Sequence, residues 1–178
     1  MNPVFLLGYM GSGKTTLGKS LSRTMKLDFI DLDNFIEGRF HCTIKELFAK
    51  RGEEGFRAVE QSVLHEVGEF NDVIIACGGG TPCFFDNMEF MNAHGTTVFL
   101  DASEWRIFER LTVPSARAKR PLIASKTDEE IKTFITEALA ARRPFYSKAK
   151  IIFNADRLES IAQLAESTNA LIEILQKV

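Results

Sequence analysis

The sequence is poor in the residues that build disulfide frameworks and zinc sites. It has only three histidines and three cysteines, namely Cys42, Cys77 and Cys83. The cysteines are odd in number and lack CxxC spacing, so we expect free thiols in a reducing compartment. The histidines form no HExxH pair and no Cys/His ligand pattern, which argues against a zinc site.

Long hydrophobic runs are also missing. No apolar stretch approaches the ~18 residues of a membrane-spanning helix. The first residues, Met-Asn-Pro-Val, lack the basic region and the apolar core of a signal peptide. We therefore expect a cytoplasmic protein without a membrane partner.

The chain has no excess of positive charge. Its 22 Lys and Arg against 24 Asp and Glu give a net charge of −2 over 178 residues, which offers no general attraction to nucleic acid. The distribution is uneven, since residues 101–150 hold 11 of the basic side chains and 7 of the acidic ones. This segment indicates either a local anion site or an ordinary solvated helix face.

Short apolar segments alternate with longer helical patterns along one domain-sized chain. The expected strands are 4–7, 27–32, 73–77, 97–100 and 151–153, and the expected helices are 15–25, 43–51, 54–70, 103–111, 128–142 and 158–177. Fully apolar strands separated by helices predict an α/β fold, with a parallel sheet covered by helices on both faces.

Two segments interrupt this alternation. Residues 33–70 contain helices where a single crossover would suffice, which indicates a small inserted subdomain. Residues 112–126 are basic, contain two prolines and show no clean period. We expect this second segment to be a lid over a site.

A phosphate-binding motif follows the first strand directly. Residues 8–15 read Gly-Tyr-Met-Gly-Ser-Gly-Lys-Thr, which matches G-x-x-x-x-G-K-[ST] between a strand and a helix. The motif predicts backbone N–H groups around phosphate oxygens, Lys14 at the β- and γ-phosphates and Thr15 on Mg²⁺. No D-x-x-G motif of a GTPase and no G-x-S-x-G motif of a hydrolase is present.

Two carboxylates close the second expected strand. Asp31 and Asp33 are two residues apart and should point the same way, at the sheet edge where ligands bind in open α/β folds. One acid can serve Mg²⁺ and the other can take a proton from an acceptor hydroxyl. Asp33 can instead cap a helix, and Asp101 is a rival metal ligand.

A third group of residues suits an acidic acceptor. Arg57 and Glu60 lie three apart on one helix face, so the glutamate can hold the arginine to grip a carboxylate, although a surface ion pair is the ordinary interpretation. Residues 78–80 are three glycines, which expose bare backbone for close approach to a ligand.

Taken together, these motifs resemble the shikimate kinase family over nearly the whole chain. The resemblance rests on Phe29-Ile30-Asp31-Leu32-Asp33, Ile44-Lys45-Glu46-Leu47-Phe48, Gly52-Glu53, Phe56-Arg57, Glu60, Gly78-Gly79-Gly80, Arg120-Pro121-Leu122 and Arg142-Arg143-Pro144-Phe145-Tyr146. It implies a monomeric domain of the nucleoside monophosphate kinase type with a five-stranded sheet, a shikimate-binding subdomain at about 33–61 and a lid at about 112–126. The implied activity is ATP-dependent phosphorylation of the 3-hydroxyl of shikimate, assisted by Mg²⁺.

The resemblance also assigns roles to residues. Catalysis falls to Lys14, Asp33 and Arg120, and metal binding to Thr15 and Asp31. The implied ATP-binding set is Gly11, Ser12, Gly13, Lys14, Thr15, Thr16, Arg110, Arg120 and Arg157. The implied shikimate-binding set is Asp33, Arg57, Gly78, Gly79, Gly80 and Arg142.

Some alternatives remain open at this stage. The 110–120 segment is slightly long for the family, so Arg117 can take part of the role of Arg120. Residues 39–44 also depart from the family's Gly and Ser-Ile pattern. Two other functions compete with this one. The first is another small-molecule kinase, of the gluconate or nucleoside monophosphate type, and the second is an ATP-binding switch without transferase activity.

Overall fold

The computed structural model describes residues 1–118 and 120–177. Its strands are β1 (Val4–Leu7), β2 (Asp28–Asp31), β3 (Val73–Ala76), β4 (Thr96–Asp101) and β5 (Ile151–Asn154). Its helices are α1 (Lys14–Met25), α2 (Leu32–Phe40), α3 (Ile44–Val67), η1 (Thr81–Cys83), α4 (Asn87–His94), α5 (Glu104–Thr112), α6 (Pro114–Ala118), α7 (Pro121–Ala124), α8 (Asp128–Tyr146) and α9 (Ile161–Leu175).

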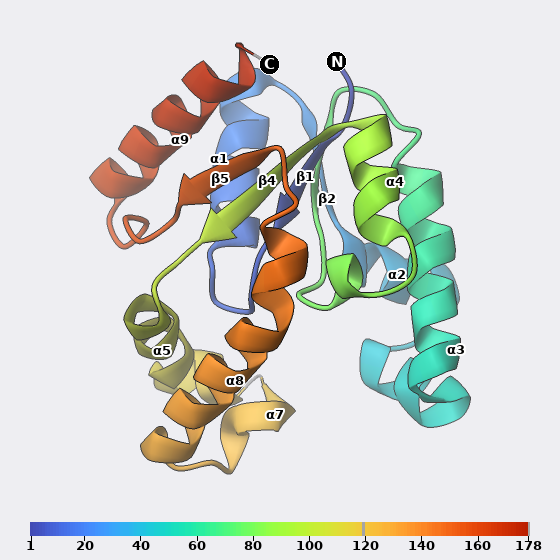
Figure 1. The fold of residues 1–178 in the computed structure, drawn as a ribbon, viewed down its shortest axis with the longest axis vertical. Coiled ribbons are helices and arrows are strands. Elements are labelled where there is room, and N and C mark those ends of the chain that lie inside the picture. The colour runs from blue at the N-terminus through green and yellow to red at the C-terminus, as the bar shows by residue number, and fades with distance from the viewer. Residues whose placement is uncertain (119, 178) are drawn as a thin grey trace.

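The strands form one parallel sheet of five strands in the order β2-β3-β1-β4-β5, with helices on both sides (Figure 1). The predicted fold class is therefore confirmed. The β1–β3 pairing continues beyond the strand, because the N–H of Cys77 donates to the carbonyl of Leu6 at 3.0 Å. The two central strands thus stay joined up to the loops that follow them.

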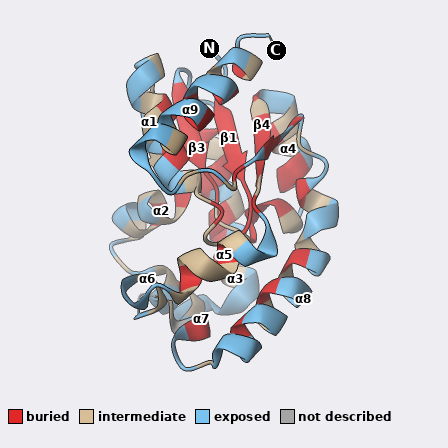
Figure 2. Cartoon of the chain, turned by 90° about the vertical axis from the view of Figure 1, so that its left-hand side faces the viewer, coloured by how far each residue is buried: buried red, intermediate tan, exposed pale blue. Residues whose placement is uncertain are grey.

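Alternate side chains of β1 enter two separate cores. Val4 and Leu6 pack with α1, α5, α8 and α9 on one face of the sheet. Phe5 and Leu7 pack with α2, α3 and α4 on the other. All four side chains are fully buried, as the red central strands of Figure 2 show. This double burial explains why β1 reads as an unbroken apolar run.

The helix boundaries agree with the prediction at one place and differ at another. The break expected between 43–51 and 54–70 is present, because α3 consists of two helical segments that meet at a kink at Gly52, where φ is 68°. Helix α8 continues past Pro144 to Tyr146, although we expected an end at 142. The proline lies in the last turn of α8, where little helix remains to be disrupted.

The predicted lid is not a plain loop. The short helices α6 and α7 occupy most of it, and the buried side chain of Ile123 anchors α7 in the core. Lys119 lies within the predicted lid but outside the described residues. In the described part of the chain, no helix is both long and apolar enough to cross a bilayer.

Candidate active site

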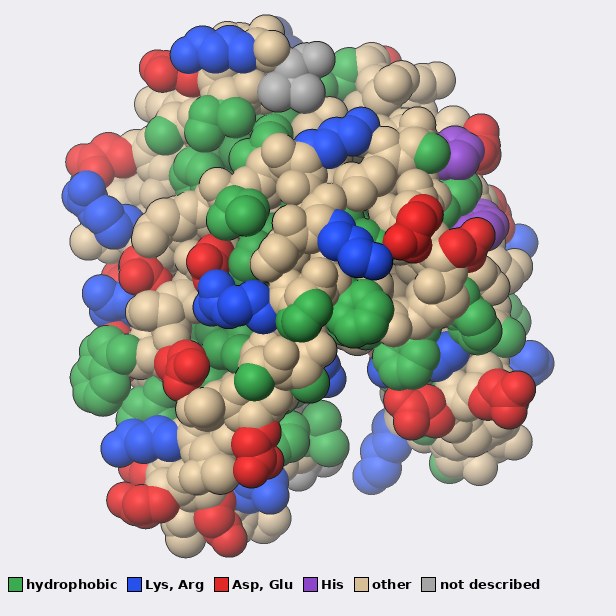
Figure 3. Space-filling model, in the orientation of Figure 1, with side chains coloured by type: hydrophobic (Ala, Val, Ile, Leu, Met, Phe, Trp, Pro, Cys, Tyr) green, Lys and Arg blue, Asp and Glu red, His purple; other side chains and the backbone are tan. Residues whose placement is uncertain are grey.

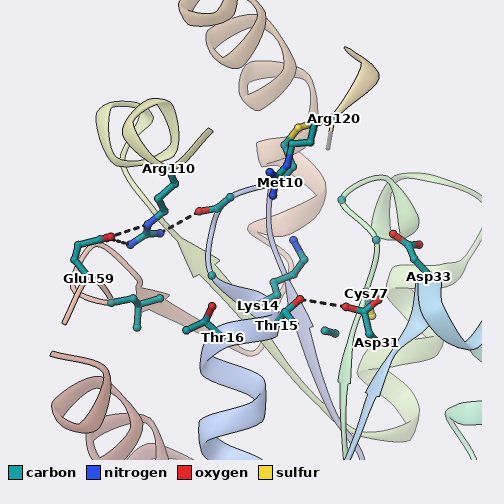
Figure 4. A pocket seen from close by; sticks show the side chains of 16 residues that line it. Met10, Lys14, Thr15, Thr16, Asp31, Asp33, Cys77, Arg110, Arg120 and Glu159 are labelled. Carbon is teal, nitrogen blue, oxygen red and sulfur yellow. Dashed lines mark hydrogen bonds and ion pairs between the residues drawn. The ribbon is translucent and has the colours of Figure 1, made fainter. Parts of the chain in front are cut away.

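A cavity of about 450 Å³ lies at the carboxyl ends of the central strands (Figure 4). The phosphate-binding loop, the ends of β2 and β3, the helix α5, the lid and the β5–α9 loop all contribute to its walls. In the space-filling view, a cleft opens between the lobe of α7 and α8 and the N-terminal part of α3 (Figure 3). Its lining residues are Met10, Gly11, Gly13, Lys14, Thr15, Thr16, Asp31, Asp33, Ala76, Cys77, Gly78, Gly79, Arg110, Arg120, Leu158 and Glu159.

The loop between β1 and α1 has the backbone that a phosphate cradle requires. Gly11 and Gly13 adopt φ values of 79° and 98°, in the region that residues with a side chain rarely enter. Gly13 precedes the first turn of α1, whose free N–H groups attract anions. The side chain of Ser12 is buried under the loop, so only its backbone is available to a ligand.

Lys14 points back into this loop. Its Nζ donates to the carbonyl oxygens of Gly8 at 2.7 Å and Tyr9 at 2.9 Å. Burial lowers the pKa of Lys14 to about 8, with Asp33 opposing the shift. The ammonium group of Lys14, with its lowered pKa, thus lies beside the phosphate-binding loop.

Thr15 and Asp31 lie close together, as predicted. Thr15 Oγ1 donates to Asp31 Oδ2 at 3.1 Å (Figure 4). The other oxygen of Asp31 accepts from the N–H of Asn34 at 3.4 Å, so Asp31 caps α2, a role that the sequence suggested for Asp33. The hydroxyl of Thr15 and the carboxylate of Asp31 are oxygen ligands of the kind that Mg²⁺ prefers. This ion binds few protein ligands and keeps several waters.

The rival ligand Asp101 is engaged elsewhere. It ends β4 and pairs with Arg143 at 3.2 Å, and it does not line the cavity. No group of three or more His, Cys, Asp or Glu that could hold a metal occurs among the described residues. The oxygens of Thr15 and Asp31 are therefore the candidate metal ligands.

Asp33 lies on the cavity wall near other acids. Burial, followed by the charges of Asp31 and Glu60, raises the pKa of Asp33 to about 6, while Lys14 acts in the opposite direction. A carboxylate with such a pKa is ionised at neutral pH and remains basic enough to accept a proton.

Arg57 is held rigidly on α3. Its Nη1 donates to Glu60 at 2.7 Å, its Cζ lies 4.0 Å from the centroid of the Phe84 ring, and its side chain is 12% exposed. Glu60 in turn accepts from the hydroxyl of Thr81 at 2.6 Å and is fully buried. The buried Nε of Arg57 has no hydrogen-bond partner in the described part of the chain. The pair is therefore a fixed donor group and not a loose surface ion pair.

The glycine triplet brings Arg57 together with Arg142. A side chain at Gly80 would lie 2.7 Å from Nη2 of Arg57, and one at Gly79 would lie 3.1 Å from Nη1 of Arg142. Gly78 likewise leaves room for Asp33, whose Oδ1 would be 3.1 Å from an added Cβ. The glycines thus leave room for two guanidinium groups and a carboxylate to approach one turn of backbone.

The lid directs Arg120 to the cavity and Arg117 away from it. Arg120 is among the lining residues, and its Nη1 donates to the carbonyl of Ala116 at 2.7 Å. Arg117 instead pairs with Asp128 at 3.1 Å and donates to the carbonyl of Lys126. This geometry favours Arg120 as the lid arginine.

Arg110 closes the far end of the cavity. It donates to the carbonyls of Gly11 at 3.1 Å and Ala155 at 2.9 Å, and to Glu159 at 2.6 Å. These bonds connect α5 to the phosphate-binding loop and to the β5–α9 loop. The planar guanidinium is thereby held at the cavity wall, where a flat base can stack.

The expected adenine contact of Arg157 is not supported. Arg157 is 65% exposed, pairs with Glu166 at 2.8 Å and does not line the cavity. Leu158 and Glu159 line it in place of Arg157, and neither these two residues nor Met10 was predicted from the sequence. The β5–α9 loop has no period that reveals which of its side chains turn inward.

Known proteins resemble this chain over nearly its whole length. The family model described as "Shikimate kinase" matches residues 10–175. A shikimate kinase from Phocaeicola vulgatus is 58% identical over 99% of this chain and 100% of its own. The crystal structure of shikimate kinase from Bacteroides thetaiotaomicron has a TM-score of 0.95 at 52% identity, covering 98% of each chain.

A more distant structure carries a ligand. Shikimate kinase from Acinetobacter baumannii in complex with shikimate has a TM-score of 0.84 at 29% identity, covering 99% of this chain and 94% of that one. The resemblance inferred from the motifs is therefore confirmed. Because the family model spans nearly the whole chain and a relative matches it end to end, the chain belongs to the shikimate kinase family.

Proposed function

We propose that the protein transfers the γ-phosphoryl group of ATP to the 3-hydroxyl of shikimate, giving shikimate 3-phosphate and ADP. The observation that carries this proposal is the approach of the Arg57 and Arg142 guanidinium groups to one glycine turn, beside the phosphate-binding loop. Two planar cations suit a carboxylate better than they suit a neutral sugar.

The donor side follows from the phosphate-binding loop. The N–H groups of Gly11, Ser12, Gly13 and the start of α1 hold the phosphates, and Arg110 stacks on the base. Thr15 and Asp31 would hold Mg²⁺, which would supply charge that neutralises the phosphates. Lys14 leaves the carbonyls of Gly8 and Tyr9 and binds the transferring group.

The acceptor side positions the alcohol. Arg57 and Arg142, with the backbone of Gly79 and Gly80, hold the carboxylate of shikimate. Asp33 orients the 3-hydroxyl and takes its proton while the new oxygen–phosphorus bond forms and the bond to ADP breaks. Its raised pKa suits this proton transfer.

The lid completes the site. Residues at about 112–126 close over the substrates and bring Arg120 to the charge that develops on the phosphoryl group. Closure also excludes water, which would otherwise hydrolyse ATP. The subdomain at about 33–61 carries Asp33 and Arg57 on α2 and α3. A monomeric state and a cytoplasmic location stay predictions.

The proposal is tested with purified protein, ATP, Mg²⁺ and shikimate, coupled to detection of ADP. We expect ADP release that depends on shikimate and stops when EDTA is added. Gluconate and nucleoside monophosphates serve as alternative acceptors, and faster turnover with either one would overturn the assignment. Calorimetry that detects ATP binding but no shikimate binding would instead support an ATP-dependent switch.

A further inference from the structure

Tyr146 makes a contact that the proposed mechanism does not use. Its side chain is fully buried at the C-terminal end of α8, and its hydroxyl donates to the carbonyl oxygen of Gly79 at 2.5 Å. The ring packs 5.0 Å from that of Phe99 on β4. The hydrogen bond from the hydroxyl holds the Gly79 carbonyl oxygen in a defined place.

The helix brings Tyr146 and Arg142 to the same turn of backbone. Residues four apart share one face of a helix, so both side chains leave α8 on the same side. Arg142 reaches Gly79 from this face, since its Nη1 would lie 3.1 Å from a Cβ there. The last turn of α8 thus fixes both the guanidinium and the peptide beside it.

The hydrogen bond to Gly79 also fixes the next N–H. The described part of the chain has no cis peptide, so the Gly79 carbonyl and the Gly80 N–H point in opposite directions from one plane. The carbonyl turns toward Tyr146, and the N–H therefore turns away from it. No backbone acceptor for the N–H of Gly79 or Gly80 is found in the described part of the chain. Burial raises the pKa of Tyr146, which keeps its hydroxyl protonated and able to donate.

We propose that Tyr146 is a positioning residue for the acceptor carboxylate: its hydroxyl holds the Gly79–Gly80 peptide so that the N–H of Gly80 faces the anion gripped by Arg57 and Arg142. The proposal rests on the proposed function, because it assumes that the anion is the carboxylate of shikimate. Without the hydroxyl, the three-glycine turn is free to rotate this peptide.

The test compares Tyr146→Phe with Phe99→Leu. The first removes only the hydroxyl, whereas the second removes the ring that packs on Tyr146 and keeps the hydroxyl. We expect Tyr146→Phe to raise the KM for shikimate by about 10-fold, the scale of one lost hydrogen-bonded contact, with the KM for ATP unchanged. Phe99→Leu should lower the unfolding temperature and leave the shikimate KM within about twofold of the original. Equal rises in both variants would overturn the proposal.

An acceptor analogue separates positioning from general loosening. With the carboxylate replaced by a hydroxymethyl group, the parent protein and Tyr146→Phe should show equal kcat/KM, because the group being positioned is gone. A 10-fold difference that persists with this analogue would contradict a role at the carboxylate.

A readout without substrate keeps the proposal distinct from the assigned activity. In protein labelled with ¹⁵N-glycine, Tyr146→Phe should shift the Gly79 and Gly80 amide resonances more than those of Gly8 or Gly11. Unmoved resonances would overturn the positioning role even if the enzyme phosphorylates shikimate. If they shift but neither protein uses shikimate, the proposed function fails, and so does the assignment of the anion.

Discussion

Arg57 donates a 2.7 Å hydrogen bond to Glu60, a carboxylate of which only 1% is exposed. The acid is paired on its other side by the hydroxyl of Thr81 at 2.6 Å. A buried charge left without its partner is strongly destabilising, so the two residues act as a unit. The bond to Glu60 uses Nη1, so Nη2, which lies 3.6 Å from the exposed carboxylate of Glu53, remains for an incoming anion.

Replacing Arg57 should weaken binding of the acceptor but not of ATP, and it should also destabilise the fold by leaving the buried Glu60 without its partner. We expect Arg57→Ala to raise the KM for shikimate by about 10- to 100-fold, the range for a lost charge-assisted contact, while the Kd for ATP measured by calorimetry stays unchanged. Arg51→Ala is the matched control, because Arg51 is an exposed arginine on the same helix. An equal loss of ATP affinity in Arg57→Ala would refute the assignment.

The rate should depend on pH in a bell shape. The pKa of Asp33 is raised to about 6, and the side chain can accept a proton only when it is deprotonated, above that pH. The lowered pKa of Lys14, about 8, means that its positive charge is lost above that pH. The kcat/KM for shikimate should therefore rise through about pH 6 and fall above about pH 8. Initial rates between pH 5 and 9.5 check this, and a flat profile over that range excludes both roles.

Asp33 should also reduce stability at neutral pH. Its pKa is higher in the folded protein than the ordinary 3.8, so the folded state binds the proton more tightly. Stability from this group is present at low pH and is lost as the pH rises from about 4 to about 6. We therefore expect Asp33→Asn to increase the free energy of unfolding by about 1–3 kcal/mol at pH 7.5, but not at pH 4.

The same substitution should lower turnover by about 100- to 10,000-fold, the usual contribution of a general base. Thermal unfolding at the two pH values and steady-state rates provide the measurements. Asp28→Asn, at an exposed position on β2, is the control and should change neither quantity. A loss of stability in Asp33→Asn at pH 7.5 would contradict the prediction, because it would show that the charged carboxylate does not destabilise the folded protein.

The two lid arginines should differ in kind. Arg120 lines the cavity, whereas Arg117 is paired with Asp128 at 3.1 Å. We expect Arg120→Ala to reduce kcat by about 100- to 1,000-fold, as for loss of one donor to a transition-state charge. Arg117→Ala should change kcat by no more than about threefold, because an exposed ion pair contributes little. The opposite ranking in single-turnover experiments would transfer the catalytic role to Arg117.

The sequence predicted well those parts where local pattern and burial agree. The strand–loop–helix around Lys14 and the strand ending at Asp31 combine an apolar run with an unambiguous motif, and both were found where expected. Helix α4 was missed because it buries few apolar side chains, Met88 and Met91 among them, which is too few to reveal a helical period.

Tertiary contacts decided the remaining differences. Arg157 and Glu159 are both polar residues of the β5–α9 loop, and only the bond from Arg110 determines that Glu159 turns inward. Likewise, nothing in the sequence around Tyr146 indicates that its hydroxyl contacts Gly79, because only the folded chain brings the two residues together. Contacts between residues this far apart in sequence leave no local pattern.

The hydrogen bond from Cys77 to Leu6 has a consequence for how the two substrates are aligned. The loop that cradles the donor leaves β1 after Leu7, and the turn that receives the acceptor follows Cys77, the residue after β3. Both loops therefore start from central strands that are hydrogen-bonded to each other. Closure of the lid determines when water is excluded from the site, whereas the sheet determines where the two substrates meet.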